Sequence, residues 1–190
     1  MRRVVEDKAF ENELFNENGF STSNYEYCTF VNCNFSSVDL SEANFMECIF
    51  DGCDLSNVIL KNTGFKTVEF KFSKLIGLHF EDCNPFLLAM NFDDCVLDFS
   101  SFYQLKLKGI SFKNCSLKSA DFTETDLTNA CFNDTNLSKA VFEYTILKGA
   151  DFRKAKNFSI NPTLNQMTKA QFSKMGALNL LSPFKIIIKD

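Results

Sequence analysis

Residues 120–152 read ADFTETDLTN-ACFNDTNLSK-AVFEYTILKG-ADF, and this stretch repeats against itself with a period of five. In each five, a small residue stands two positions before a large apolar one. An amphipathic helix requires apolar residues at spacings of three and four, and a half-buried strand requires alternation by two, so neither element explains the pattern. A fixed short repeat predicts a solenoid, in which each unit buries its apolar face only against its stacked neighbours. The small residues are Ala120, Thr125, Ala130, Thr135, Ala140, Thr145 and Ala150, and the large ones are Phe122, Leu127, Phe132, Leu137, Phe142, Leu147 and Phe152.

The same pattern extends in both directions from this stretch. It runs from Cys28 to Phe80, resumes at Met90, and returns once more at residues 170–172. The count from Phe80 to Phe92 is twelve rather than ten, so the register shifts by two within residues 81–91. An Asn-Pro pair in this segment favours a turn, and proline cannot donate to a strand ladder. We interpret the break as a small bulge or corner loop, either a tolerated insertion or a loop that contacts a partner.

These fives resemble the motif of the pentapeptide-repeat family, A(D/N)LXX or A(D/N)FXX. Residues 120–122, 135–137 and 150–152 fit that motif as they stand. The resemblance implies an all-β fold, a right-handed quadrilateral β-helix with about five residues per side and about twenty per coil. If four fives close a square, the alternation places Phe on two opposite walls and Leu on the other two. Phe112 is then expected to lie under Phe132.

The repeat pattern divides the chain into three parts. Residues 1–25 keep a large apolar residue at every fifth position but lack the small residue two positions before it. We interpret them as atypical N-terminal repeats or a cap. Residues 26–172 are expected to form the pentapeptide-repeat solenoid, with its break at 81–91. Residues 173–190 are expected to form a short C-terminal helical/strand tail that serves as a cap or a dimerisation segment.

The C-terminal tail is apolar, with a short helix expected over 175–181 and a strand-like run after it. The open end of a β-helix is an exposed edge that invites pairing. The tail is therefore interpreted either as a cap folded back on the last coil or as a dimer contact, and the resemblance implies a homodimer through the C-terminal ends. The candidate dimer contacts are Met175, Leu178, Leu180, Leu181, Phe184, Ile186 and Ile188.

The cysteines and the single histidine do not form a catalytic or metal-binding pattern. Zinc sites require CxxC pairs or nearby histidines, whereas the closest cysteine pairs are five apart and the only histidine is His79. No P-loop or GxGxxG is present. We expect no enzyme activity, no cofactor and no metal. Six cysteines occupy the small slot, the position two residues before the large apolar residue of a five, and we interpret them as buried residues that fill the core. These six are Cys28, Cys33, Cys48, Cys53, Cys95 and Cys115.

Five aspartates stand directly before the large apolar residue of a five. A short polar side chain in this position can hydrogen-bond the backbone two residues on, as Asp and Asn do in turns. We therefore interpret these aspartates as structural rather than as an acid/base pair. They are Asp39, Asp54, Asp121, Asp126 and Asp151.

Charge is distributed unevenly around the net value of −4. Residues 1–60 hold eleven acids and three bases, a net of −8, and residues 61–190 hold thirteen acids and seventeen bases, a net of +4. The acidic part disfavours direct contact with nucleic acid and suits a basic groove on a partner, although solvation alone also explains such asymmetry. No apolar run approaches transmembrane length, and Val4-Val5-Glu6-Asp7 is not the apolar core of a signal peptide, so a cytoplasmic protein without a membrane partner is expected.

The best-understood relatives are the Qnr-like and MfpA-like proteins, rods that resemble DNA and bind type II topoisomerases. The resemblance therefore implies a DNA mimic that binds DNA gyrase or topoisomerase IV and modulates quinolone susceptibility. The alternative is a non-catalytic rigid interaction scaffold for another protein. The candidate partner-binding acids are Glu42, Glu47, Asp51, Asp54, Asp82, Asp93, Asp94 and Asp98.

Overall fold

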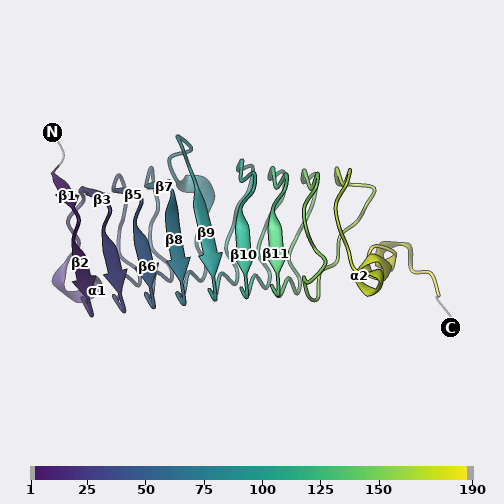
Figure 1. Ribbon diagram of the computed structural model, residues 1–190, viewed down its shortest axis with the longest axis horizontal. Coiled ribbons are helices and arrows are strands. Elements are labelled where there is room, and N and C mark those ends of the chain that lie inside the picture. Colours follow the sequence, from purple (N-terminus) through teal and green to yellow (C-terminus); the bar gives the residue numbers. More distant parts are fainter. Residues whose placement is uncertain (1–2, 188–190) are drawn as a thin grey trace.

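The computed structural model describes residues 3–187 and shows a rod of stacked four-sided coils (Figure 1). All strand pairs are parallel, and each residue pairs with the residue twenty positions later, as Phe30 does with Phe50. Across the break the step is 22, from Phe70 to Phe92. One coil is therefore twenty residues long, with one insertion of two. The predicted β-helix is confirmed.

Two parallel sheets run along the rod, and their strands are short because each side of a coil holds only about five residues. The four-stranded sheet contains β1 (Val4–Glu6), β3 (Asn24–Glu26), β5 (Asn44–Met46) and β7 (Gly64–Lys66). The seven-stranded sheet contains β2 (Ala9–Glu11), β4 (Thr29–Val31), β6 (Ile49–Asp51), β8 (Val68–Lys71), β9 (Met90–Asp93), β10 (Ser111–Lys113) and β11 (Cys131–Asn133). The short helices are α1 (Phe15–Asn18), η1 (Phe80–Asp82), α2 (Lys174–Asn179) and η2 (Ser182–Phe184).

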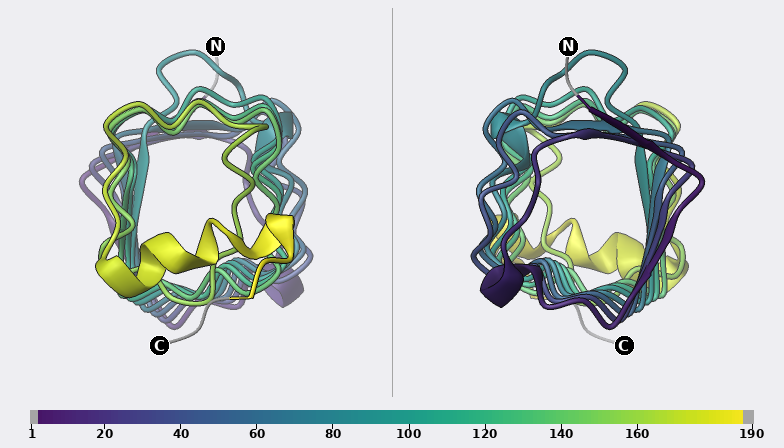
Figure 2. Two further views of the ribbon diagram at one scale, coloured as in Figure 1. Left: turned by 90° about the vertical axis from the view of Figure 1, so that its right-hand side faces the viewer. Right: turned by 90° about the vertical axis from the view of Figure 1, so that its left-hand side faces the viewer.

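The end-on views show a square outline, and we number its sides in chain order (Figure 2). Side 1 carries the four-stranded sheet and continues beyond the break through single bridges such as Lys106 to Asp126. Side 2 carries the seven-stranded sheet. Side 3 is a ladder of single bridges that includes Asn34 to Asp54, and side 4 is another that includes Asp121.

The large apolar residues fill the interior and stack in columns. The rings of Phe112 and Phe132 stack at 5.4 Å on side 2, and those of Phe102 and Phe122 stack at 5.0 Å on side 4. The predicted placement of Phe on opposite walls is confirmed for these coils. The earlier coils lack this alternation, and there Phe45 on side 1 meets Phe50 on the adjacent side 2 at 5.2 Å.

The small slot is buried, as predicted. The six cysteines assigned to it are 0–3% exposed, and none forms a disulfide. Burial raises the pKa of the Cys48 and Cys53 thiols to about 12, so these groups stay protonated and unreactive. In the later coils threonine fills the same slot, and Thr125 Oγ1 donates a hydrogen bond of 2.8 Å to the carbonyl oxygen of Phe102.

The aspartates before the large residues hold the corners, as predicted. Asp39 Oδ1 accepts from the backbone N–H of Ser41 at 2.9 Å, and Asp121 Oδ1 accepts from Thr123 N–H at 2.8 Å. The third residue after such an aspartate often has positive φ, a conformation that Asn and Asp tolerate better than most residues. These bonds satisfy backbone donors where the chain turns from one side to the next.

The two ends of the rod differ. At the N-terminal end, β1 and β2 pair in register with β3 and β4, so the described residues 3–25 form a coil of the solenoid. At the other end, α2 lies across the last coil and Ser173 caps it by accepting from Gly176 N–H at 3.0 Å (Figure 2). The predicted helix is confirmed, but residues 185–187 have no regular secondary structure, so the tail shows no strand among the described residues.

Candidate interaction surface

The eight candidate partner-binding acids do not form a single strip on the rod. Four lie on two neighbouring sides, and the other four lie at corners or next to them. Consecutive members therefore point in different directions around the square. Asp51 and Asp93 are on side 2, Asp54 and Asp98 on side 3, Glu42 and Asp82 follow side 4, Glu47 lies between sides 1 and 2, and Asp94 lies between sides 2 and 3.

Some of these acids hold the local backbone. Asp98 Oδ1 accepts from Ser116 Oγ at 2.6 Å and from the backbone N–H of Lys118 at 2.9 Å. Asp54 Oδ1 accepts from the backbone N–H of Ser56 at 3.0 Å. Part of their role is therefore structural, and the exposed corner acid Glu47 is a better candidate for contact with a partner.

On side 2 the acids alternate with lysines. Strand pairing places Lys71 between Asp51 and Asp93, and the next residue in the row is Lys113. Lys113 Nζ lies 2.7 Å from Asp93 Oδ2, and this hydrogen bond raises the pKa of Lys113. The centre of side 2 therefore carries balanced charge rather than the purely anionic surface expected of a DNA mimic.

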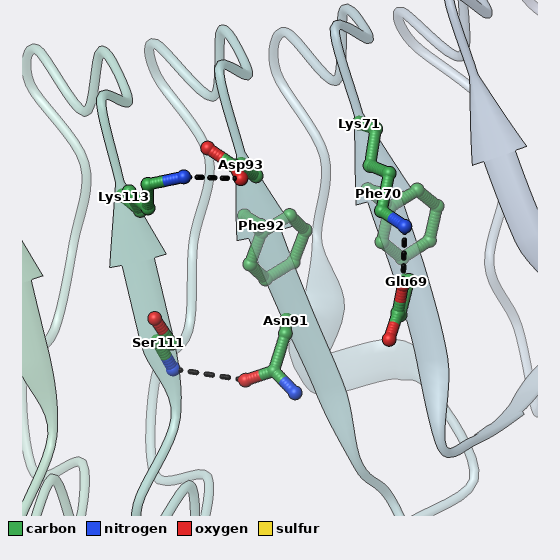
Figure 3. Close-up of a pocket in the computed structure, with 8 residues that line it drawn as sticks. All are labelled: Glu69, Phe70, Lys71, Asn91, Phe92, Asp93, Ser111 and Lys113. Carbon is green, nitrogen blue, oxygen red and sulfur yellow. Dashed lines mark hydrogen bonds and ion pairs between the residues drawn. The ribbon is translucent and has the colours of Figure 1, made fainter.

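A shallow groove of about 260 Å³ crosses the centre of side 2 (Figure 3). Lys71 turns back to Glu69 of its own strand, with 2.6 Å between Nζ and Oε2. Ser111 donates its backbone N–H to Asn91 Oδ1 at 3.0 Å, so a side chain contributes to the link between β9 and β10. Polar and charged side chains rim the groove, and the backbone of Phe70 and Phe92 forms its floor.

Four exposed apolar side chains were missed by sequence analysis, which assigned large apolar residues to the interior. Phe86 and Leu87 are 66% and 65% exposed in the loop at the register shift, which projects from the square outline (Figure 2). Lys66 Nζ lies 5.6 Å from the centre of the Phe86 ring. Phe72 and Phe99 are 64% and 67% exposed at corners. Their position two residues after a core residue was the available signal.

The tail is partly a cap and partly exposed. Gly176 is buried, and a Cβ added there would lie 3.1 Å from the Phe158 ring, so α2 sits tightly on the last coil. Leu180 packs against the core, whereas Met175 is 74% exposed and Phe184 is 50% exposed. Of the other candidate dimer contacts, Leu178 and Ile186 are exposed, Leu181 is half-buried, and Ile188 lies outside the described residues.

The family model for the pentapeptide repeat region matches residues 23–86 and 78–152, which together span more than half of the chain. The chain belongs to the pentapeptide-repeat family. A search of curated protein sequences found no match.

Two solved structures show that the pentapeptide-repeat solenoid extends over nearly the whole chain. A trypsin-treated variant of QnrB1, a plasmid-mediated fluoroquinolone resistance protein, is similar with a TM-score of 0.63 at 16% identity, covering 98% of this chain and 97% of that one. HetL from the cyanobacterium Nostoc sp. strain PCC 7120, involved in heterocyst differentiation regulation, has a TM-score of 0.69 at 15% identity, covering 90% and 86%. At these identities the likeness establishes the fold alone.

The pentapeptide-repeat solenoid is a scaffold type of fold. Within residues 3–187, no group of three or more His, Cys, Asp or Glu side chains is arranged to hold a metal ion. No helix in the same described part of the chain has the length and apolar character needed to cross a membrane. The candidate functional features are therefore the acidic N-terminal part, the charged rows of side 2 and the apolar tail.

Proposed function

We propose that this pentapeptide-repeat protein is a rigid rod that binds DNA gyrase or topoisomerase IV through its acidic N-terminal part and thereby alters the response of the enzyme to quinolones. The observation that carries the proposal is the concentration of negative charge at one end of a straight rod, a net of −8 in residues 1–60 against +4 in the remainder. An acidic rod fits a groove that is built to hold DNA.

The acidic end is presented on all sides of the rod rather than along one face. Glu47 occupies the corner between sides 1 and 2, and Glu42 follows side 4, so the two flank the same sheet. Asn62 Nδ2 donates to Glu42 Oε2 at 2.8 Å, which orients that carboxylate without removing its charge. A groove that encloses the rod from several directions would contact both corners at once.

The second half of the proposed assembly is a homodimer through the C-terminal ends. Met175, Leu178 and Phe184 expose apolar surface on the outside of the cap formed by α2 and η2. Burial of such surface against a second copy would stabilise the dimer at about 25 cal/mol per Å² of apolar area. A two-fold contact of this kind would place the two acidic parts at the outer ends of a longer rod.

The proposal is tested by titrating the purified protein into gyrase supercoiling reactions with and without ciprofloxacin. We expect inhibition, or rescue from the drug, at micromolar or lower protein concentration. The Glu42→Gln/Glu47→Gln double variant should weaken this effect. The matched control is Glu124→Gln/Glu143→Gln, which removes the same charge from side 4 in the later coils and should leave the effect unchanged. Equal loss in both variants, or no effect of the wild-type protein, contradicts the proposal.

A second candidate function is a rigid scaffold for a different protein. The charge balance at the centre of side 2 favours it, because Lys71 and Lys113 lie in the same row as Asp51 and Asp93. The fold likeness to HetL, involved in heterocyst differentiation regulation, shows that this solenoid also occurs outside quinolone resistance. A scaffold for another partner predicts no gyrase binding at any salt concentration.

A further inference from the structure

The outward-facing residue directly after each buried Phe of side 2 forms one row along the rod. In-register pairing places Glu11 beside Val31, Val31 beside Asp51, and Asp51 beside Lys71. The row continues through Asp93, Lys113 and Asn133. The bridges from Cys131 to Asp151 and from Asp151 to Gln171 extend the same register, so Arg153 follows Asn133 and the uncharged Ser173 comes last.

The charges of this row are complementary to those of a second copy of the row placed opposite it in the reverse order. Glu11 meets Arg153 when Ser173 is left beyond the overlap. Asp51 meets Lys113, and Lys71 meets Asp93. The remaining pair, Val31 with Asn133, is uncharged, so every charged position meets the opposite charge.

We propose that two copies of this chain associate face to face through side 2, with their rods antiparallel. The two-fold axis would lie in the interface along the strand direction and pass between β8 and β9. Such an axis keeps the row opposite its own copy and reverses its order, which is the arrangement that the charges require. In a two-fold interface each contact occurs twice, so the three kinds of ion pair give six contacts.

The second outward row of side 2, which precedes the buried Phe residues, is compatible with the same arrangement. Under the same axis Glu69 meets Asn91, and Asp151 meets Ala9, so no two like charges face each other. The loop at the register shift leaves from side 1 and does not obstruct the seven strands of side 2 (Figure 1). The long sheet therefore offers a continuous surface for a second sheet to stack on.

Each cation of the row also has an ion-pair partner within one copy. Lys71 pairs with Glu69 at 2.6 Å, and Arg153 pairs with Asp151 at 2.7 Å. Lys113 pairs with Asp93 at 2.7 Å, and the charges alternate along the rod. A second copy in the proposed register adds an opposite charge across the interface, so each charged side chain gains a new partner while it keeps its neighbours in the row. Like-charge contacts directly across the interface are avoided at every position.

The expected dimer is weak and sensitive to salt. The strands of side 2 are spaced ~4.8 Å apart, and each presents two outward side chains. Together they give a strip on the order of 400 Å² per copy. This is about half of the area per partner in a standard protein interface. Exposed ion pairs are also screened by salt, with a Debye length of about 10 Å at 0.1 M.

The test uses two full-length charge-reversal variants, Asp51→Lys and Lys113→Asp. In the proposed dimer each variant places like charges opposite each other twice, so each alone should associate at least about tenfold more weakly than wild type at low salt. A mixture of the two should regain association, because in the mixed dimer Lys at 51 faces Asp at 113 in one contact and the native Lys113 faces the native Asp51 in the other. The double variant Asp51→Lys/Lys113→Asp should also self-associate, with the charges exchanged.

The measurement is sedimentation velocity over a range of protein and salt concentrations, with circular dichroism to confirm that each variant is folded. Matched controls on the opposite side of the rod are Glu143→Lys and Lys61→Asp, which should behave as wild type. Any association through the C-terminal tail is common to all samples, so only the differences report on side 2. No difference between the variants and wild type, or no recovery in the mixture, overturns the proposal. Either result is independent of whether gyrase is a partner.

Discussion

The coils before the register shift and the coils after it build the same square from different side chains. Before the shift, Phe45 and Phe65 stack at 5.5 Å on side 1, and Phe50 stacks on Phe70 at 5.1 Å on side 2. In these two coils Phe therefore lines two adjacent walls, and in the coils nearest the N-terminus Phe15 and Phe35 also stack on side 3 at 4.6 Å. After the shift, Phe lines the opposite sides 2 and 4, and side 1 carries leucines such as Leu127.

The difference shows that the solenoid accepts either Phe or Leu in the large position of a five, rather than assigning Phe to particular walls. On side 3, Phe35 is followed one coil later by Leu55, and both are buried. The exchange on side 1 occurs where the loop at the register shift leaves that side, between Phe65 and Leu107. Side 4 also changes, from Leu60 to Phe80, one coil apart and before the loop. Close packing is therefore met locally in each coil, and the loop coincides with only one of these exchanges.

The largest effect is expected from removal of a stacked ring in the later coils. Phe132 stacks on Phe112 at 5.4 Å and on Phe152 at 4.7 Å, and it is fully buried. Phe132→Ala should lower the free energy of unfolding by about 3–5 kcal/mol, because it leaves a cavity between two rings that cannot close it. Phe50→Ala in the earlier coils should cost a similar amount. Urea denaturation measures both, and a loss below about 1 kcal/mol in either region would contradict the stacking account.

A smaller effect is expected when one region is given the residue of the other. Leu127→Phe places a ring in a side-1 column of leucines and should destabilise the protein by about 1–3 kcal/mol through overpacking. The reverse change, Phe45→Leu, should cost about 1–2 kcal/mol through a cavity between Tyr25 and Phe65. If either exchange left the urea midpoint unchanged, that column would accept Phe and Leu equally well.

The small slot also differs between the regions, with cysteine prominent in the first and threonine in the second. Thr125 Oγ1 bonds the carbonyl of Phe102 at 2.8 Å, whereas the Cys48 thiol lies 3.4 Å from the carbonyl of Tyr25. Thr125→Val keeps the shape but removes the donor, and should cost about 1 kcal/mol. Exposed Thr168→Val is the control and should change stability by less than about 0.5 kcal/mol. Equal effects at the two positions would show that the buried hydrogen bond contributes nothing.

The smallest effect is expected from the corner aspartates as the pH falls. Hydrogen bonds from Ser41 lower the pKa of Asp39 in the first region, and those from Arg153 lower the pKa of Asp151 in the second. A carboxyl group with a lowered folded pKa contributes stability above its unfolded value, near 3.9, and loses it as the pH falls through the folded value. Thermal unfolding from pH 5 to pH 2 should therefore be less pH-dependent in Asp39→Asn and in Asp151→Asn than in wild type. An unchanged pH dependence would contradict the capping role.

The fold could be predicted because the period of five is a local rule repeated many times. The small residue, the aspartate and the large residue of each five have separate physical roles, and Cys53, Asp121 and Phe132 each lie where those roles place them. The shift of two between Phe80 and Phe92 also predicted an irregular corner. The opposite walls of Phe could be predicted only where Phe and Leu alternate, and not around Phe45 and Phe50, where two Phe residues occupy consecutive fives.

The surface was harder to predict, because neighbours on it are twenty residues apart in the chain. The alternation of Asp51, Lys71, Asp93 and Lys113 becomes visible only when the sequence is read once per coil and the shift of two is included. The exposed Phe86 was assigned no role for a similar reason, since apolar residues in a repeat are expected to face inward. A comparison of residues that occupy the same position in successive coils would have predicted the charged row, but not that the loop projects from the rod.

The most direct test of the proposed function is equilibrium binding of the purified protein to immobilised DNA gyrase across a series of salt concentrations. An acidic rod in a DNA-binding groove predicts binding that weakens steeply as salt rises, as protein–DNA association does. The Glu42→Gln/Glu47→Gln variant should bind more weakly and with a shallower salt dependence than wild type. Absence of binding at every salt concentration, or binding that is insensitive to both salt and these substitutions, would contradict the account.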